Sequence, residues 1–158
     1  MSSFERAKQG AAHVLAVWFG CGHVPFAPGT AGTLGALPLY LALRPHGPCA
    51  VALAAALVAA VGIWASSVVA RRLELRDPQI VCIDEVAGVL VTWLAAPPGW
   101  RGVAAGFVVF RILDQLKPWP ARLAERRLPD GWGIVGDDLV AGAWGAAVLV
   151  LARQLGWL

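Results

Sequence analysis

The chain has 158 residues, of which 58% are hydrophobic and only 15% are charged, and its mean hydropathy is +0.65. So few charged side chains cannot cover the surface of a soluble domain of this length in the usual way. The composition excludes a disordered, collagen-like or nucleic-acid-coating chain. The length favours a single domain, residues 1–158, and the composition favours a place in a lipid bilayer. The alternative is a soluble helical bundle that buries its apolar surface in an oligomer.

The formal net charge is +3 and the isoelectric point is about 9.1. No basic helix face interleaved with aromatic residues accompanies this charge, so we expect no nucleic-acid partner. Cys21, Cys49 and Cys82 are odd in number and widely spaced, which argues against a disulfide framework. Because the positive charge does not mark a nucleic-acid surface, we interpret it as a signal of membrane orientation.

Apolar segments follow one another along most of the chain. The longest, residues 49–70, has no charged residue, and as a helix it extends about 33 Å, enough to cross a bilayer. Four shorter segments are residues 33–43, 86–96, 102–113 and 139–152. Pro38 predicts a kinked or partly inserted helix in the first of these. The connections between segments are short, so we expect an all-α, multi-pass membrane bundle with short, partly broken helices that crosses five times.

Five crossings place residues 20–32, 71–85 and 114–138 on the same side of the membrane. The opposite side then carries only three basic residues: Arg44, Arg101 and Arg153. The positive-inside rule identifies the first side, which holds the other basic residues, as the cytoplasm. All ten acidic residues also fall on that side, which predicts an acidic site at the cytoplasmic interface.

Carboxylates lie at the predicted ends of three helices: Asp84, Glu85, Asp114, Asp137 and Asp138. The Asp84–Glu85 and Asp137–Asp138 pairs each open an apolar helix, while Asp114 closes one that runs the opposite way. Clustered carboxylates repel one another unless a cation neutralises them, and ligands that are all oxygen favour Mg²⁺, Mn²⁺ or Ca²⁺ over Zn²⁺. Helix capping is the alternative for one member of each pair, but it does not account for Asp114.

Arg111 and Lys117 lie three residues before and three residues after Asp114, on one face of a helix that ends before Pro118. A guanidinium and an ammonium group beside a metal-binding acid suit a phosphate, because they neutralise the phosphoryl oxygens that the metal does not contact. The alternative is a salt bridge within the helix.

The Gly-, Pro- and Thr-rich residues 22–35 lead directly into an apolar helix, for which Thr33 is the predicted N-cap. Such a loop aims backbone N–H groups and Thr30 at an anion, although a simple connecting turn has a similar composition. His23 is the only histidine that the predicted arrangement places near the proposed site. It suits phosphate binding or protonation of a leaving group, and its alternative role is a hydrogen-bonded loop histidine.

Four segments resemble the signatures of the phosphatidylglycerophosphatase A family: HVPFAPGTAGTLGALPL (23–39), IVCIDEVAGVLVTW (80–93), FRILDQLKPWP (110–120) and GIVGDDLVAG (133–142). They occur in the family's order and spacing, and the resemblance extends over residues 14–150. It implies a Mg²⁺-dependent lipid phosphatase of the bacterial inner membrane, and the distribution of charges predicts that its active site lies on the cytoplasmic side. The implied reaction converts phosphatidylglycerophosphate to phosphatidylglycerol and inorganic phosphate.

The residues and the resemblance together imply individual roles. The expected metal ligands are Asp84, Glu85, Asp114 and Asp138, and Asp137 is a further expected catalytic residue. The expected phosphate-binding residues are His23, Thr30, Arg111, Lys117 and Arg122. Either an activated water or an aspartyl-phosphate intermediate is compatible with these roles.

Two other classes of membrane protein are alternatives at this stage. A small transporter or ion-binding protein predicts acidic residues at several depths and on both sides, whereas here they fall on one side. A purely structural subunit leaves the acidic helix ends without a purpose. The expected partners are the substrate and membrane lipid, and assembly into a homo-oligomer stays open.

Overall fold

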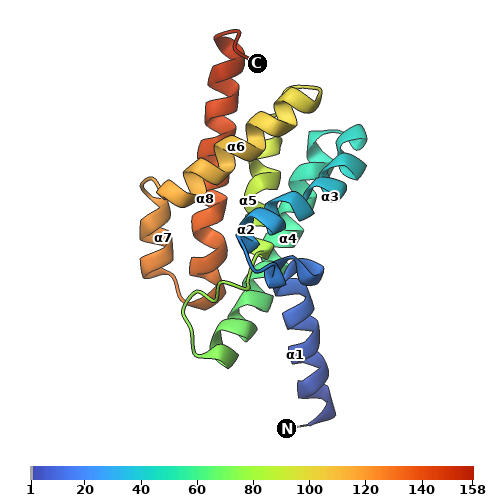
Figure 1. Ribbon diagram of the computed structural model, residues 1–158, viewed down its shortest axis with the longest axis vertical. Coiled ribbons are helices and arrows are strands. Elements are labelled where there is room, and N and C mark those ends of the chain that lie inside the picture. The colour runs from blue at the N-terminus through green and yellow to red at the C-terminus, as the bar shows by residue number, and fades with distance from the viewer. Residues whose placement is uncertain (1) are drawn as a thin grey trace.

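The computed structural model describes residues 2–158 (Figure 1). Helices are the only regular secondary structure in this described range, which confirms the all-α prediction. The elements are α1 (Ser3–Ala16), η1 (Trp18–His23), α2 (Pro28–Gly35), α3 (Leu37–Leu43), η2 (Arg44–His46), α4 (Pro48–Leu73), α5 (Ile83–Trp93), α6 (Trp100–Leu116), α7 (Ala121–Arg127) and α8 (Asp130–Gln154). Both η elements are 3₁₀ helices.

Helix α5 lies at the centre of the bundle, where it contacts α2, α4, α6 and α8. Its apolar side chains point in all directions, which is typical of a helix enclosed by others. Val86, Leu90 and Trp93 are almost fully buried and pack in one cluster with Phe110 of α6. The Trp93 indole N–H also donates to the Val103 carbonyl at 3.0 Å. This packing fixes the position of α5, and therefore of the acidic residues in its first turn.

Helices α5 and α8 approach each other backbone to backbone. A Cβ atom on Gly142 would lie 2.3 Å from the Gly88 carbonyl oxygen, and one on Gly88 would lie 2.6 Å from the Asp138 carbonyl oxygen. Small residues permit such contacts between helices. The Thr92 hydroxyl donates across the same contact to the Gly142 carbonyl at 3.2 Å. The glycines therefore bring the acidic start of α5 close to Asp138.

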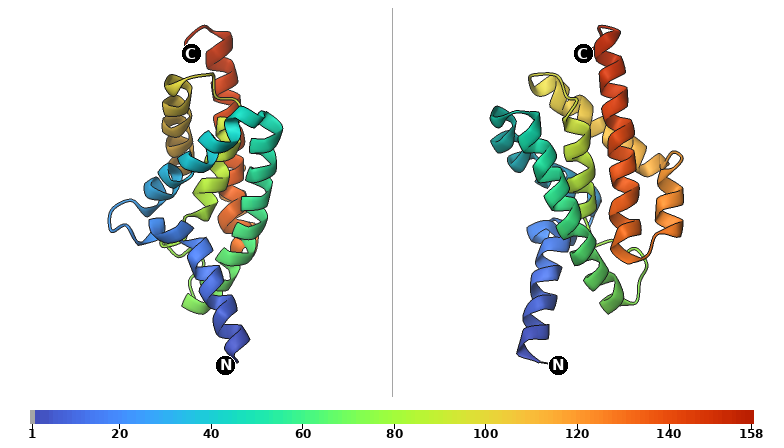
Figure 2. Two further views of the ribbon diagram at one scale, coloured as in Figure 1. Left: turned by 90° about the vertical axis from the view of Figure 1, so that its right-hand side faces the viewer. Right: turned by 180° about the vertical axis from the view of Figure 1, so that it is seen from behind.

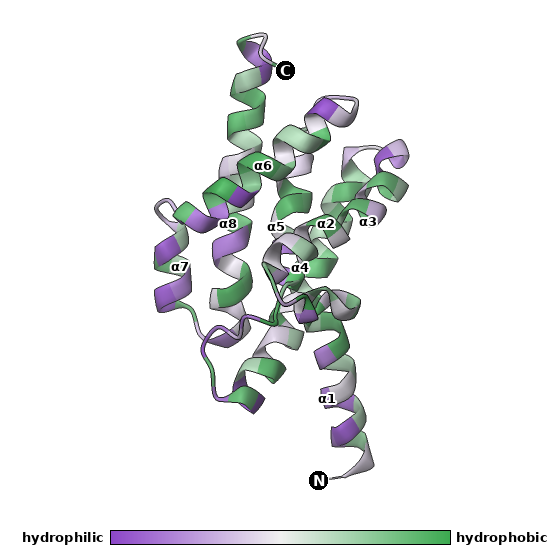
Figure 3. Cartoon of the chain, viewed as in Figure 1, coloured by the Kyte–Doolittle hydropathy of each residue, from purple (hydrophilic) through white to green (hydrophobic). Residues whose placement is uncertain are grey.

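Two helices, α4 with 26 residues and α8 with 25, are long and apolar enough to cross a membrane among the residues described. Large apolar side chains point outward from the bundle, for example Leu53 and Leu57 on α4 and Leu151 on α8, each more than half exposed. Figure 3 shows hydrophilic residues gathered on α7, the last turns of α4 and α1. Figure 2 shows α1 and the end of α8 projecting from opposite ends of the molecule. Five crossings remain a prediction, because α5 has only 11 residues.

The expected break in segment 33–43 is confirmed, since α2 ends at Gly35 and α3 has a proline in its first turn. The predicted N-cap at Thr33 is wrong. Helix α2 starts at Pro28, whose fixed φ suits a first helical position, and the Thr33 hydroxyl instead donates to the Gly29 carbonyl at 2.7 Å.

The predicted start of the last helix at Asp137 is also wrong, because α8 begins at Asp130. Three glycines precede Asp137 and disfavour a helix by intrinsic propensity. Contact with α4 outweighs this preference: the Gly131 N–H donates to the Ser67 hydroxyl at 3.0 Å, and a Cβ on Gly131 would lie 2.1 Å from the Ile63 carbonyl oxygen. Asp137 and Asp138 therefore lie about two turns inside a helix.

Candidate active site

Three carboxylates from two helices converge where α5 meets α8. Asp84 and Glu85 lie in the first turn of α5, and Asp138 comes from α8. One oxygen atom of each lies within 4.8 Å of those of the other two. Asp84 is only 8% exposed and Asp138 only 3%, so water screens their charges poorly. Three such charges repel one another strongly unless a cation or protons neutralise them.

Each of these carboxylates has one buried oxygen without a hydrogen-bond partner among residues 2–158: Asp84 Oδ1, Glu85 Oε2 and Asp138 Oδ2. Buried polar atoms are nearly always bonded, so unbonded ones call for an explanation. Hard divalent cations such as Mg²⁺ take oxygen ligands, carboxylates above all. The donor set and its unpartnered atoms therefore fit a hard divalent cation.

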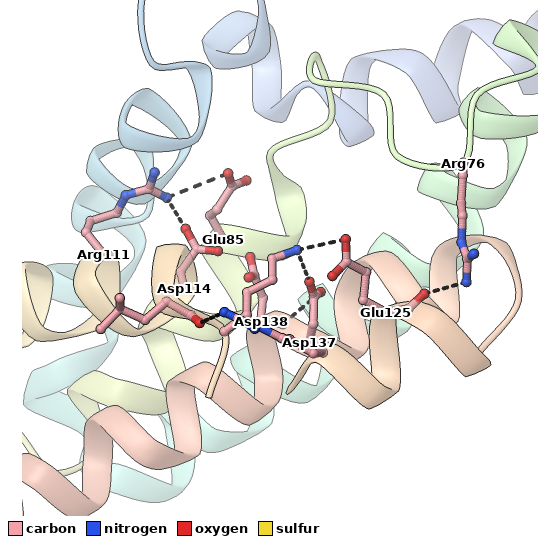
Figure 4. Close-up of polar contacts among 10 residues, drawn as sticks. Arg76, Glu85, Arg111, Asp114, Glu125, Asp137 and Asp138 are labelled. Carbon is pink, nitrogen blue, oxygen red and sulfur yellow. Dashed lines mark hydrogen bonds and ion pairs between the residues drawn. The ribbon is translucent and has the colours of Figure 1, made fainter. Parts of the chain in front are cut away.

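Arg111 of α6 lies beside this group (Figure 4). Its Nη1 atom is 2.8 Å from Asp114 Oδ2 and 3.7 Å from Glu85 Oε1, and its Nε atom has no hydrogen-bond partner in the described part of the chain. The guanidinium thus keeps donors available for an anion. Asp114 forms the salt bridge within α6 that was the alternative reading, and it is not a member of the three-carboxylate group. Its role as a metal ligand remains a prediction.

Lys117 directly follows the last residue of α6 and connects this helix to two others. Its Nζ atom lies 2.6 Å from Asp137 Oδ2 on α8 and 3.3 Å from Glu125 Oε1 on α7. Burial by itself lowers the pKa of Lys117, but the hydrogen bond and charge of Asp137, together with the charge of Glu125, hold that pKa above its usual value. Lys117 is therefore a permanent cation at physiological pH, and it fixes the Asp137 carboxylate beside the cluster.

A cavity of about 440 Å³ lies over these groups. Its charged lining residues are Asp77, Asp84, Glu85, Arg111, Asp114, Lys117, Asp137 and Asp138. Pro25 and residues 27–29 line it from the start of α2. A Cβ on Gly29 would lie 1.9 Å from Glu85 Oε1, so any larger residue here would displace the Glu85 carboxylate. The cavity thus combines acidic groups, two cations and a helix start, which suits a doubly charged anion and a metal.

Asp77 is a cavity residue that the sequence analysis missed. It lies with Gln79 in the connection between α4 and α5, and both line the cavity. Burial raises the pKa of Asp77; the charge of Lys117 opposes this shift, and the charges of Glu125 and Asp114 add to it. The one available signal was its place in a predicted connection on the acidic side, seven residues before Asp84.

Three predicted phosphate-binding residues are not among the described residues that line the cavity: His23, Thr30 and Arg122. The His23 Nε2 atom lies 3.3 Å from that of His13. The Arg122 Nη2 atom donates to the Leu116 carbonyl at 3.1 Å. Thr30 directly follows Gly29, which does line the cavity. The phosphate-binding roles of all three remain predictions.

Comparison with known proteins identifies the family. The family model described as phosphatidylglycerophosphatase A matches residues 14–153. The chain is 39% identical over 138 residues to "Phosphatidylglycerophosphatase A" of Escherichia coli (strain K12), which covers 87% of this chain and 80% of that protein. It is 33% identical over 144 residues to the protein of the same name from Haemophilus influenzae, with coverage of 90% and 88%.

A third relative carries a different name. The chain is 38% identical over 151 residues to a Bacteroides thetaiotaomicron protein named "Putative phosphatidylinositol-3-phosphatase", which covers 89% of this chain and 92% of that protein. No solved structure matches the chain. The family match spans most of the sequence and contains all three carboxylates of the cluster. The chain therefore belongs to the phosphatidylglycerophosphatase A family of phosphatases.

Proposed function

We propose that this protein is a Mg²⁺-dependent lipid phosphatase that hydrolyses phosphatidylglycerophosphate to phosphatidylglycerol and inorganic phosphate. One observation carries the proposal: a single cavity is lined by three carboxylate residues that each have an unpartnered buried oxygen, and by Arg111, whose Nε atom has no partner among the described residues. Carboxylates that hold a metal beside an arginine are the groups that phosphoryl transfer requires. Family membership supports the lipid substrate.

The headgroup is the finer part of the proposal. Two of the relatives are named for phosphatidylglycerophosphate and the third for phosphatidylinositol 3-phosphate. We favour phosphatidylglycerophosphate because the family model carries that name as well. The cavity volume of about 440 Å³ accommodates a phosphate and part of a polar headgroup, while the acyl chains stay outside.

In the proposed complex, Arg111 and Lys117 bind oxygens of the phosphomonoester. Asp84, Glu85 and Asp138 would hold Mg²⁺, with Asp114 as a further candidate ligand, and the ion supplies positive charge against the phosphoryl oxygens. Lys117 suits binding more than proton donation because its raised pKa keeps it protonated. Asp137, held by Lys117 at 2.6 Å, is fixed beside the reacting phosphate.

The reaction that we propose is direct hydrolysis. The oxygen of a water forms a bond to phosphorus while the bond from phosphorus to the glycerol oxygen breaks. A cavity carboxylate accepts the proton of the water, and a proton returns to the glycerol oxygen, so that an alcohol and inorganic phosphate leave. An aspartyl-phosphate route is the competing version, and trapping of a phosphorylated protein with acid would identify it.

We further propose that the protein is a multi-pass protein of the bacterial inner membrane with this cavity on the cytoplasmic side. The length of α4 and α8 supports crossing, and the basic residues at the cavity side support the orientation. A lipid phosphomonoester then meets the cavity at the level of the headgroups.

The test is phosphate release from phosphatidylglycerophosphate by the detergent-purified protein, in Mg²⁺ and in EDTA. We expect Mg²⁺-dependent release that Asp84→Asn and Asp138→Asn each reduce at least about 10²-fold, because metal affinity and charge neutralisation are lost together. The melting temperature provides the folding control. We expect Mg²⁺ to raise the melting temperature of the wild type, because the ion binds the folded state, and to raise the melting temperature of the variants by less.

Phosphatidylinositol 3-phosphate serves as the competing substrate in the same assay. Faster phosphate release from this lipid than from phosphatidylglycerophosphate would show that the inositol lipid is the preferred substrate. Release that is indifferent to EDTA and to both substitutions, from folded protein, would contradict the metal–carboxylate mechanism.

A further inference from the structure

Beside the residues that line the cavity lies an aromatic side chain that is almost fully exposed. Phe26 is 86% exposed, and it stands between Pro25 and Ala27, both of which line the cavity. Ala27 has φ 54°, in the left-handed region. This conformation turns the chain into α2 immediately after Phe26 and leaves the phenyl ring outside the cavity.

The 3₁₀ helix η1, which comes just before this connection, presents a second exposed phenyl ring. Phe19, in η1, is 71% exposed and also has a positive φ of 54°. The left view of Figure 2 shows the connection between η1 and α2 projecting from the side of the bundle. Two exposed phenyl rings within eight residues of the chain are costly in water and favourable in a lipid interface, where aromatic side chains are enriched.

The chemistry of Phe26 differs sharply from that of the cavity. The cavity is lined by six acidic and two basic residues, which suits the phosphate and not a hydrocarbon chain. Phe26 itself and Val24, two residues before it, are instead exposed apolar side chains. A phosphorylated lipid whose phosphate enters the cavity must leave its glycerol backbone and acyl chains at the rim, where Phe26 lies.

We infer that Phe26, assisted by Phe19, forms a lipid-contacting lip that selects phosphomonoesters carried on membrane lipids over water-soluble phosphomonoesters. This inference rests on the proposed function and deepens it. Phe26 inserts among the lipid chains beside the cavity and holds the substrate with its phosphate directed inward. Water-soluble esters gain nothing from this contact.

The first experiment compares two substrates in proteoliposomes: long-chain phosphatidylglycerophosphate in the bilayer, and its analogue with two short acyl chains at concentrations where it is monomeric in water. For Phe26→Ser we expect the ratio of kcat/KM on the long-chain lipid to kcat/KM on the short-chain ester to fall at least about tenfold. Phe26→Trp is expected to retain the ratio because it keeps an aromatic ring.

Phe4→Ser is the matched control. Phe4 is 74% exposed but lies near the start of α1, no residue of which lines the cavity among the residues described. We expect its ratio to stay within about twofold of the wild type. An unchanged ratio for Phe26→Ser, an equal loss on both substrates, or an equal fall in the ratio for Phe4→Ser would each overturn the inference.

A second measurement does not depend on catalysis. A Phe26→Cys variant in a Cys21→Ser, Cys49→Ser background is labelled with a fluorophore; the remaining Cys82 is buried. In proteoliposomes we expect quenching by lipids with a quencher on the acyl chain and protection from aqueous iodide. If the wild type acts on neither substrate, the proposed function fails and this measurement still decides the lipid contact. Quenching by iodide, or protection from both quenchers as a protein partner would give, overturns it.

Discussion

Lys117 joins three helices through two carboxylates. Its Nζ atom is 2.6 Å from Asp137, which is only 4% exposed, and 3.3 Å from Glu125. A buried carboxylate that loses its cationic partner keeps its desolvation cost and loses the compensating attraction. The ammonium therefore has a structural effect in addition to the phosphate binding that we propose for it.

We predict that Lys117→Met lowers the free energy of unfolding by about 2 kcal/mol, because it leaves Asp137 buried without a partner. Adding Asp137→Asn to this variant removes the uncompensated charge and is expected to recover about half of the loss. Chemical unfolding of both variants in detergent measures the effect. A double variant less stable than Lys117→Met would show that the ion pair is not the source of the loss.

Individual site residues differed in how well the sequence predicted them. Asp84 and Glu85 precede an apolar run, so their place in a first helical turn followed from the pattern. Asp77 was missed because a single acid in a connection has no periodicity, and only the folded chain brings it to the cavity. The partner of Lys117 was equally invisible: Asp137 is 20 residues away, and the spacing rule for helices pointed to Asp114 instead.

At the scale of the elements, the α5–α8 contact sets the distance between the carboxylates. A side chain on Gly142 would collide with the backbone of α5, 2.3 Å from the Gly88 carbonyl oxygen. Backbone atoms cannot move aside as a flexible side chain can. Any substitution here therefore separates α5 from α8, and with them Asp84 from Asp138.

We predict that Gly142→Ala lowers the free energy of unfolding by about 1–3 kcal/mol, as overpacking does, and reduces phosphatase activity by more than the loss of folded protein explains. Gly10→Ala is the control, because nothing lies within 4 Å of an added Cβ there; it is expected to leave activity unchanged and to stabilise α1 slightly. Melting curves measure the stability of each variant, and phosphate release from the same samples shows whether activity falls by more than the loss of folded protein explains. Full activity of Gly142→Ala would show that the spacing is not critical.

The sequence predicted the existence of the helices better than their starts. Hydrophobic length identified α4, and Pro38 identified the break before α3. The start of α8 was placed too late because Gly131, Gly133 and Gly136 resemble a loop, whereas in the fold they are the surface on which α4 and α7 pack. Intrinsic propensity is local, and tertiary contacts that it does not contain decided this boundary.

On the scale of the whole molecule, the ends of α4 test the proposed orientation. Cys49, in the first turn, is exposed, and Glu74 is the residue that caps the last turn. With 26 residues, α4 extends about 39 Å, which separates these positions by more than the hydrocarbon core of a bilayer.

We predict that a membrane-impermeant maleimide added to intact bacterial cells labels Cys49 and does not label Glu74→Cys. The second variant carries Cys21→Ser and Cys49→Ser, and Cys82 is buried. Breaking the cells should make position 74 reactive. Labelling of position 74 alone from outside would reverse the orientation, and labelling of both positions from outside would show that α4 does not cross.

The backbone contact between α5 and α8 also bears on discrimination between metals. Gly88 and Gly142 leave these helices no room to come closer, and the buried packing of Trp93 with Phe110 of α6 also holds α5 in place. A cluster held this stiffly adapts poorly to a change in ionic radius. Ca²⁺ takes oxygen ligands at about 2.3–2.6 Å, whereas Mg²⁺ takes them at about 2.0–2.1 Å, so if the carboxylates hold Mg²⁺ as we propose, we expect Ca²⁺ to be a poor substitute in the phosphate-release assay.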